Sequence, residues 1–222
     1  MSSLRIGGLD VDRAKALAHA RRYLTDGKGW AYPAYDAYER DRADGPLTDA
    51  DLLAPVLLNV SRMQIKTYEA LQAKREELDE HLARIPVDLD LADADENALT
   101  VLGDLFAVLD GPGVWGAKGT VLAKVLHRKR PRFVPLYDEQ VRTVYQAGPE
   151  APVKLPPRRT RRAWRDFVVL YAAAVQDDLR RESDLWAEIA GLATEPPITT
   201  LRALDIVAWK AGQQGQPLAP TT

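Results

Sequence analysis

Most of the chain spaces its hydrophobic residues three or four positions apart, which is the pattern of helices that bury one face. Over 63–85, for example, charged residues occupy the opposite face. The helices that this pattern predicts cover residues 11–24, 48–60, 63–85, 97–109, 117–126, 138–145, 161–179, 185–192 and 200–209. No segment alternates hydrophobic and polar residues as a half-buried strand does. The sequence therefore predicts an all-α fold.

Residues that favour helix starts support these boundaries. Thr48 and Asp51 have the spacing of a capping box, with Asp in place of the usual Glu. Asp10 is a candidate N-cap for the first helix, and Thr199 or Thr200 for the last one. We expect a single domain, which is divided into N-terminal helices (1–96), a central hairpin region (97–150), C-terminal helices (151–212) and a loose tail (213–222).

Composition narrows the classes of function. The 222 residues are 46% hydrophobic and 28% charged, which is ordinary for a globular protein. The absence of cysteine excludes disulfides, iron–sulfur clusters, thiolate zinc sites and cysteine nucleophiles. No run reaches the roughly 18 hydrophobic residues of a membrane span, and the N-terminus lacks the pattern of a signal peptide. We expect a cytoplasmic protein without a membrane partner, metal or cofactor, and its oligomeric state stays open.

Positive charge is concentrated in the second half of the chain. Between His127 and Arg165 there are eleven Lys or Arg and three acidic residues, so this window carries +8 and the remainder carries −10. Two clusters supply most of the charge, and they consist of Arg128, Lys129, Arg130 and Arg132, and of Arg158, Arg159, Arg161 and Arg162. Such clusters attract the phosphates of a nucleic acid, although they also occur as solvated faces. The charge pattern favours DNA as the partner.

A glycine-rich hairpin precedes these clusters. Residues 111–116 read Gly-Pro-Gly-Val-Trp-Gly and join two hydrophobic helices, with Lys118 just beyond. Gly113 and Gly116 permit positive φ angles and leave neighbouring amides uncovered. Free N–H groups at the start of the second helix, together with its dipole, suit one phosphate. A plain turn between two helices is the alternative interpretation.

The stretch from Gly113 to Tyr145 resembles the helix-hairpin-helix superfamily of base-excision DNA glycosylases. Residues 112–116 are similar to the superfamily's hairpin with one inserted tryptophan, and Lys118 lies at its offset from the last glycine. Residues 133–138, Phe-Val-Pro-Leu-Tyr-Asp, resemble the aliphatic run that ends in an aspartate. The chain as a whole looks like a member of an actinobacterial family of unknown function, on the strength of residues 51–55 and 124–131.

This resemblance implies a two-lobed helical domain of DNA-glycosylase-like fold, with a helix-hairpin-helix motif within 97–150. Such a protein binds DNA and excises a modified base after flipping it out of the duplex. The resemblance implies that Asp138 stabilises the cationic sugar or activates a nucleophile, and that Lys118 is an amine nucleophile. From the residues alone, Asp138 is also a good helix N-cap, and Lys118 is also an exposed phosphate contact.

Two other functions are compatible with the same sequence. The first is a non-catalytic nucleic-acid-binding or accessory protein of DNA repair or phage defence. The second is a protein-interaction module whose acidic helices form the contact surface. The aromatic residues of 30–38 likewise have two interpretations, because they can stack on an exposed base or pack the N-terminal segment onto the body.

Overall fold

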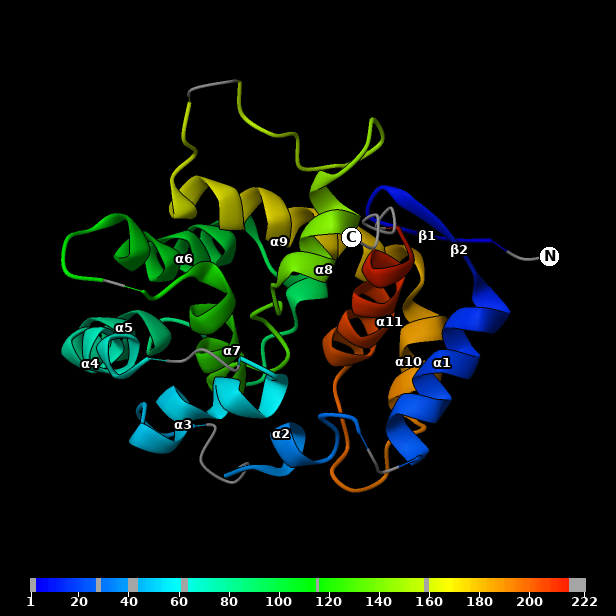
Figure 1. Ribbon diagram of the computed structural model, residues 1–222, viewed down its shortest axis with the longest axis horizontal. Coiled ribbons are helices and arrows are strands. Elements are labelled where there is room, and N and C mark those ends of the chain that lie inside the picture. The colour runs from blue at the N-terminus through cyan, green and yellow to red at the C-terminus, as the bar shows by residue number, and fades with distance from the viewer. Residues whose placement is uncertain are drawn as a thin grey trace, which may run out of the picture.

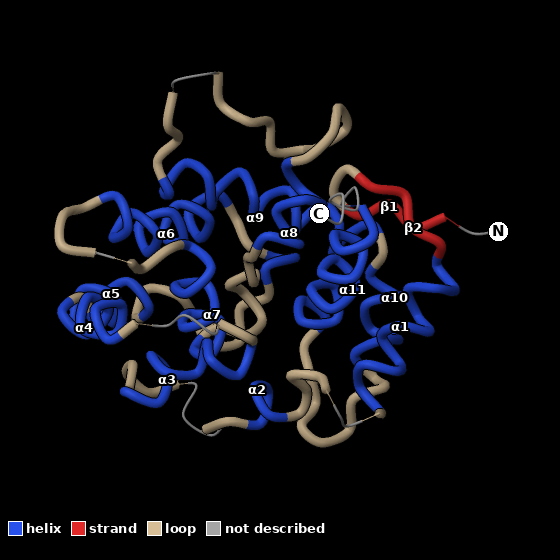
Figure 2. Tube along the Cα trace, viewed as in Figure 1, coloured by secondary structure: helices blue, strands red, loops and turns tan. Residues whose placement is uncertain are grey.

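The computed structural model describes residues 3–26, 29–39, 44–60, 64–114, 116–157 and 160–215. This part of the chain is mostly helical, with one short two-stranded sheet near the N-terminus (Figures 1 and 2). Its buried hydrophobic residues form a cluster that extends from Leu4 in the first strand to Ala211 in the last helix. This architecture is compatible with the all-α prediction, apart from one short hairpin at the beginning that the sequence did not predict.

Residues 3–12 form a β-hairpin that the hydrophobic pattern did not predict. Strands β1 (Ser3–Ile6) and β2 (Leu9–Asp12) pair antiparallel, and Leu4 and Ile6 are fully buried. Four residues in each strand are too few for an alternating pattern to stand out. The signal that was available is the pair of glycines in the loop, because Gly7 has a φ of 53°, as tight hairpin turns require.

Of two predicted helix starts, one is confirmed by the structure and one lies at a different residue. The capping box of Thr48 and Asp51 is confirmed, since each side chain bonds to the backbone of the other residue. Helix α1 (Arg13–Thr25) begins later than predicted, and its N-cap is Asp12 instead of Asp10. Asp10 lies within β2, so the hairpin is the reason for this difference.

The other helices largely follow the predicted ranges, except for α2, which lies in a segment where the sequence predicted no helix. They are α2 (Ala34–Ala37), α3 (Asp49–Leu53), α4 (Ile65–Ala73), α5 (Arg75–Leu82), α6 (Glu96–Ala107), α7 (Gly119–Lys129), α8 (Glu139–Gln146), α9 (Trp164–Arg181), α10 (Ser183–Ala190) and α11 (Thr200–Gly215), with 3₁₀ turns η2 (Ala54–Leu58), η3 (Leu91–Asp93) and η4 (Val108–Asp110). The predicted helix 63–85 is divided at Lys74, whose backbone leaves helical geometry. The predicted helix 48–60 becomes a 3₁₀ turn from Ala54, because Pro55 disfavours a continuous α-helix there.

Helix α11 organises one side of the fold by packing against α1, α8 and α10 (Figure 1). Its start is capped by Thr199, whose Oγ1 accepts a hydrogen bond from the Arg202 amide at 3.0 Å. On the other side α6 packs along α9, and α7 contacts α3 and η2. A cleft lies where α7, η2 and the start of α8 meet α11.

The hairpin region joins α6 to α7, but its two helices do not pack along each other. The principal neighbour of α6 is α9, and α7 is packed against η2 and α3. The packing of these helices does not show a helix-hairpin-helix motif. The glycosylase-like fold that the resemblance implies therefore stays a prediction.

The crossing of α8 and α11 depends on one glycine. A Cβ atom added at Gly212 would overlap the backbone carbonyl of Gln140 in α8, which cannot rotate away. Gly212→Ala should therefore lower the free energy of unfolding by about 2 kcal/mol, because this overlap outweighs the gain in helix propensity. Urea unfolding monitored by circular dichroism measures the change.

Gly191→Ala provides the matched control for this prediction. An added Cβ there would meet its nearest atoms at 3.4 Å and 3.5 Å, an ordinary contact distance, and Gly191 has helical backbone angles. The control should change stability by less than about 0.5 kcal/mol. Equal stability of the wild type and Gly212→Ala would contradict the close approach of α8 and α11.

Candidate functional site

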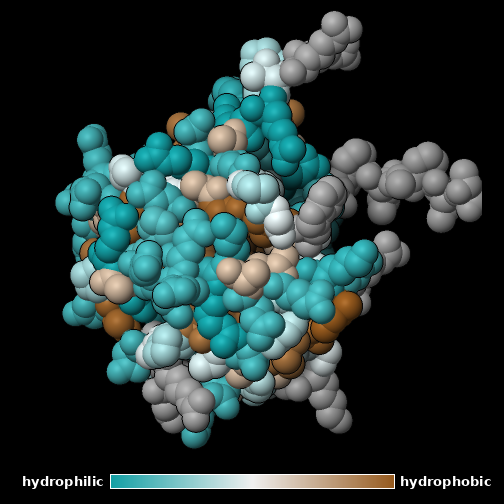
Figure 3. Space-filling view, turned by 90° about the vertical axis from the view of Figure 1, so that its left-hand side faces the viewer, coloured by the Kyte–Doolittle hydropathy of each residue, from teal (hydrophilic) through white to brown (hydrophobic). Residues whose placement is uncertain are grey.

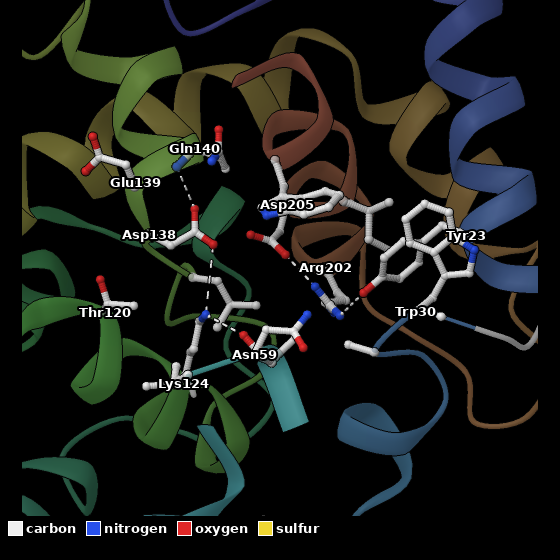
Figure 4. Close-up of a pocket in the computed structure, with 17 residues that line it drawn as sticks. Tyr23, Trp30, Asn59, Thr120, Lys124, Asp138, Glu139, Gln140, Arg202 and Asp205 are labelled. Carbon is white, nitrogen blue, oxygen red and sulfur yellow. Dashed lines mark hydrogen bonds and ion pairs between the residues drawn. The ribbon is translucent and has the colours of Figure 1, made fainter. Parts of the chain in front are cut away.

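A cleft of about 500 Å³ lies between α11 and the segment formed by η2, α7 and the start of α8 (Figure 4). Its polar walls carry three acidic side chains and two cations, and aromatic side chains close the end nearest α1. Its polar and aromatic lining residues include Tyr23, Trp30, Asn59, Thr120, Lys124, Asp138, Gln140, Arg202, Asp205 and Trp209. Volumes of this size are typical of small-molecule sites.

Asp138 caps α8 and also faces the cleft, and its catalytic role stays a prediction. Its Oδ1 accepts hydrogen bonds from the amides of Gln140 and Val141, at 3.0 Å and 3.1 Å, so the predicted N-cap of α8 is confirmed. Its Oδ2 turns into the cleft, where it lies 3.9 Å from Nζ of Lys124 (Figure 4). The helix amides therefore fix the carboxylate while one oxygen stays available to a ligand.

Lys124 places a buried ammonium group beside this carboxylate. Its side chain is only 7% exposed, and Nζ donates a hydrogen bond to the carbonyl of Leu58 at 3.1 Å. Burial lowers the pKa of Lys124, and the nearby charge of Asp138 opposes that shift. The pair provides an anion and a cation side by side at one wall of the cleft.

Arg202 and Asp205 form a second charged pair on α11. The Arg202 guanidinium is buried and bonds to Asp36 at 2.9 Å, to the Tyr23 hydroxyl at 3.1 Å, and to Oδ2 of Asp205. Burial raises the pKa of Asp205 to about 6, Arg202 opposes this shift, and Asp138 adds to it. Asp205 therefore holds its proton more tightly than an exposed aspartate does.

Aromatic rings form the wall of the cleft nearest α1. The rings of Tyr23 and Trp30 lie 5.1 Å apart, and the ring of His19 meets Trp30 edge-on at 5.6 Å. Burial lowers the pKa of His19 to about 4, so this ring is neutral at physiological pH. Tyr35 is buried in the core, as the packing interpretation of segment 30–38 expects, while Trp30 lines the cleft and its stacking on a base stays a prediction.

The predicted phosphate-binding hairpin is exposed, but none of the described residues of 111–118 lines the cleft. Gly113 and Gly116 have φ angles of 87° and 79°, as the glycine pattern predicts. Exposed Lys118 precedes α7, and Thr120 two residues later lines the cleft. Trp115 lies outside the described residues. The structure does not bring Lys118 into the lining of the cleft that contains Asp138, and its role stays a prediction.

The first basic cluster is largely internal, which corrects the prediction that it forms a phosphate-binding surface. Lys129 is 1% exposed and lies 2.9 Å from Asp51, whose other oxygen lies 3.4 Å from Arg128. Arg130 is also buried, and it donates hydrogen bonds to the carbonyls of Leu82 and Ile85 at the end of α5. The carbonyl groups at a helix end require donors, and Arg130 supplies them.

The remaining predicted contacts differ in their exposure. Arg132 is half-exposed and pairs with Asp90. Arg161 is exposed, Arg162 is partly buried, and Arg158 and Arg159 lie outside the described residues. Cations that can face a polyanion are therefore fewer than the sequence suggested.

Comparison with known proteins places this cleft within a family. The family described as "Family of unknown function (DUF6308)" matches residues 16–212, a range that contains every residue of the cleft. The chain belongs to this family. No curated protein and no solved structure matches the chain. The match assigns no activity, so the resemblance to DNA glycosylases stays a prediction.

Two sequence segments that suggested a family are joined in the structure. Asp51 belongs to the first of them, 51–55, and its partners Arg128 and Lys129 belong to the second, 124–131. The buried ion pairs therefore hold α3 against α7 and support the wall that carries Lys124. In the described part of the chain, no group of three His, Asp or Glu is arranged to hold a metal, and no helix is long and apolar enough to cross a membrane.

Several residues of the cleft were missed by the sequence analysis, although two of them left a signal. Lys124 interrupts the hydrophobic run Val121–Leu126. Arg202 and Asp205 are the two charged residues in 201–208, a segment whose other residues are all hydrophobic. A charged residue inside a hydrophobic run is rarely buried without a partner, so it marks a candidate site. Asn59 and Gln140 left no comparable signal.

The surface that carries the acidic helix α5 was the candidate contact surface of the protein-interaction hypothesis. Figure 3 views the side of the molecule on which α4 and α5 lie, and this face is mostly hydrophilic with small separate hydrophobic areas. Such a surface is typical of a solvated face. It offers no support for the protein-interaction hypothesis.

Proposed function

We propose that the cleft binds a nucleobase and that Asp138 promotes hydrolysis of its N-glycosidic bond, with DNA as the carrier of the base. The position of Asp138 is the main observation behind this proposal, because its carboxylate is held by helix amides with one oxygen directed into the cleft. A fixed negative charge at that point stabilises the positive charge that develops on the sugar as the bond breaks.

The walls of the cleft suit a planar polar ligand. Trp30, Tyr23 and Trp209 supply aromatic surface on which a base can stack. The side chains of Asn59 and Gln140 offer amide donors and acceptors near Asp138. A base that enters between these groups brings its sugar toward Asp138 and Lys124.

DNA is the favoured carrier because the exposed hairpin leads into α7, the helix whose Thr120 and Lys124 line the cleft. The glycines leave its backbone amides accessible, and Lys118 adds a positive charge beside them. Contacts of this kind read the phosphate backbone and not the sequence. Burial of the first basic cluster limits the number of such contacts, so binding should be weaker and less salt-dependent than the +8 charge of 127–165 alone predicts.

The proposal is tested with duplexes that each carry one altered base: uracil, hypoxanthine, 7-methylguanine or 8-oxoguanine. After incubation with the protein, treatment with alkali converts each abasic site into a strand break that a gel detects. We expect breaks at one or more of these bases. The absence of breaks and of released base across the whole panel would contradict the proposal.

A second candidate substrate is a free nucleoside. The internal bonding of Arg128, Lys129 and Arg130 favours it, because fewer cations are left for a DNA backbone. Chromatography of free nucleosides incubated with the protein separates the two cases. Release of the base from free nucleosides but not from duplexes supports the second substrate. Release of the base from duplexes but not from free nucleosides supports DNA.

A further inference from the structure

We propose that Asp205 is the proton donor of this cleft and protonates the nucleobase as it leaves. The inference rests on the proposed function and adds a second carboxyl group to it. Glycoside hydrolases generally use two carboxyl groups, one ionised near the sugar and one protonated near the leaving group, and the same division of roles suits release of a base that must leave protonated. Asp138 and Asp205 are the two aspartates among the described residues that line the cleft.

The two carboxyl groups lie on different helices and have different neighbours. Asp138 stands at the start of α8, whereas Asp205 projects from α11, and Figure 4 places the Asp205 carboxyl between Arg202 and Asp138. Arg202 bonds to Oδ2 of Asp205, and Oδ1 accepts no hydrogen bond from any residue that the structure describes. Oδ1 is therefore the oxygen that can carry a proton toward a ligand.

Charged and titratable groups reach Asp205 from each helix packed around it. They are Asp138 at the start of α8, Lys124 from α7, Tyr23 from α1, Tyr35 from α2, Tyr171 from α9 and Arg202 from α11 itself. The buried residues of α10 are all hydrophobic. Burial dominates this balance and raises the pKa of Asp205 to about 6, which is suitable for an acid that works near neutral pH.

Glu139 is a third acidic residue at the cleft, and its surroundings exclude it as the acid. Its side chain is largely exposed and pairs with Arg142. The hydrogen bond from Arg142 lowers the pKa of Glu139, so it is ionised at neutral pH. Asp205 is the acidic residue of the cleft whose pKa is raised.

The proposed step balances as a hydrolysis. The bond between C1′ of the sugar and the base nitrogen breaks, its electron pair stays on the base, and the Asp205 proton is transferred to the base. Asp138 stabilises the positive charge on the sugar, and water then adds to C1′ and gives up a proton to Asp138. Exchange with solvent removes this proton and reprotonates Asp205, so neither residue is consumed.

The inference is tested by comparing two leaving groups in Asp205→Asn. Hypoxanthine leaves as an anion unless it is protonated, whereas 7-methylguanine already carries a positive charge and leaves as a neutral base. In single-turnover assays, Asp205→Asn should slow release of hypoxanthine by about 10²–10³-fold and release of 7-methylguanine by less than about 5-fold. The wild-type rate for hypoxanthine should fall as pH rises above about 6, where Asp205 loses its proton.

Asp36→Asn is the matched control, because Asp36 also bonds to Arg202 but does not line the cleft. It should slow release of both bases by a similar, small factor. Equal slowing of both bases in Asp205→Asn would assign Asp205 a structural role and overturn the inference, while wild-type release of 7-methylguanine would leave the proposed function standing.

A direct titration tests the inference without any substrate. Carboxyl ¹³C NMR of the wild type and of Asp205→Asn identifies the Asp205 signal by its absence in the variant. A midpoint near pH 6 is expected. A midpoint below about 4, the value for an exposed aspartate, would overturn the inference even if no altered base were released.

Discussion

Replacing Asp138 with asparagine should lower the rate of base release by about 10²–10⁴-fold while the fold stays intact. Asparagine caps a helix as well as aspartate does, so the amides of Gln140 and Val141 keep an acceptor. The negative charge beside Lys124 disappears, and with it the stabilisation of the cationic sugar. Single-turnover assays on the base that the wild type releases fastest measure this loss.

Asp95→Asn is the control for this substitution. Asp95 caps α6 in the same way, through a hydrogen bond from the Ala98 amide at 2.8 Å, and it does not line the cleft. Both variants should unfold within about 1 kcal/mol of the wild type, and only Asp138→Asn should lose activity. An active Asp138→Asn protein would limit Asp138 to its capping role and would remove the main support for the proposed reaction.

Replacing Arg202 with methionine should lower the free energy of unfolding by about 3–5 kcal/mol. Methionine fills much of the same volume, but it leaves the carboxyl groups of Asp36 and Asp205 buried without their cation. The loss should be larger at pH 8 than at pH 5, because Asp205 has a raised pKa and protonation relieves the buried charge. Chemical unfolding at the two pH values measures both effects.

Arg142→Met is the control for this second prediction. Arg142 also forms an ion pair with an acidic residue, Glu139, but both side chains are exposed. Exposed pairs contribute little, so the control should change stability by less than about 1 kcal/mol. A similarly small effect of Arg202→Met would contradict a buried, charged Arg202 at the floor of the cleft.

The sequence alone determined most of the helices and the local structure at their ends. Period-3.6 spacing located helices such as α6 and α9, and residue type identified the capping roles of Thr48 and Asp138. These features depend on neighbours within a few residues, so they can be predicted without tertiary contacts. The short β-hairpin at residues 3–12 was missed, because its strands are stabilised by burial against distant helices.

Only the tertiary structure decided which charged residues face a ligand. A run such as Arg128–Arg130 has the same composition whether it binds phosphate on the surface or forms ion pairs and hydrogen bonds inside the protein. Here its side chains are internal, because Asp51 and the carbonyl of Leu82 at the end of α5 bind them. Likewise Lys124, Asp138 and Asp205 are far apart in the chain and meet only where α7, α8 and α11 converge. Whether a charge is buried, paired or available depends on what packs around it, and a linear pattern does not contain that information.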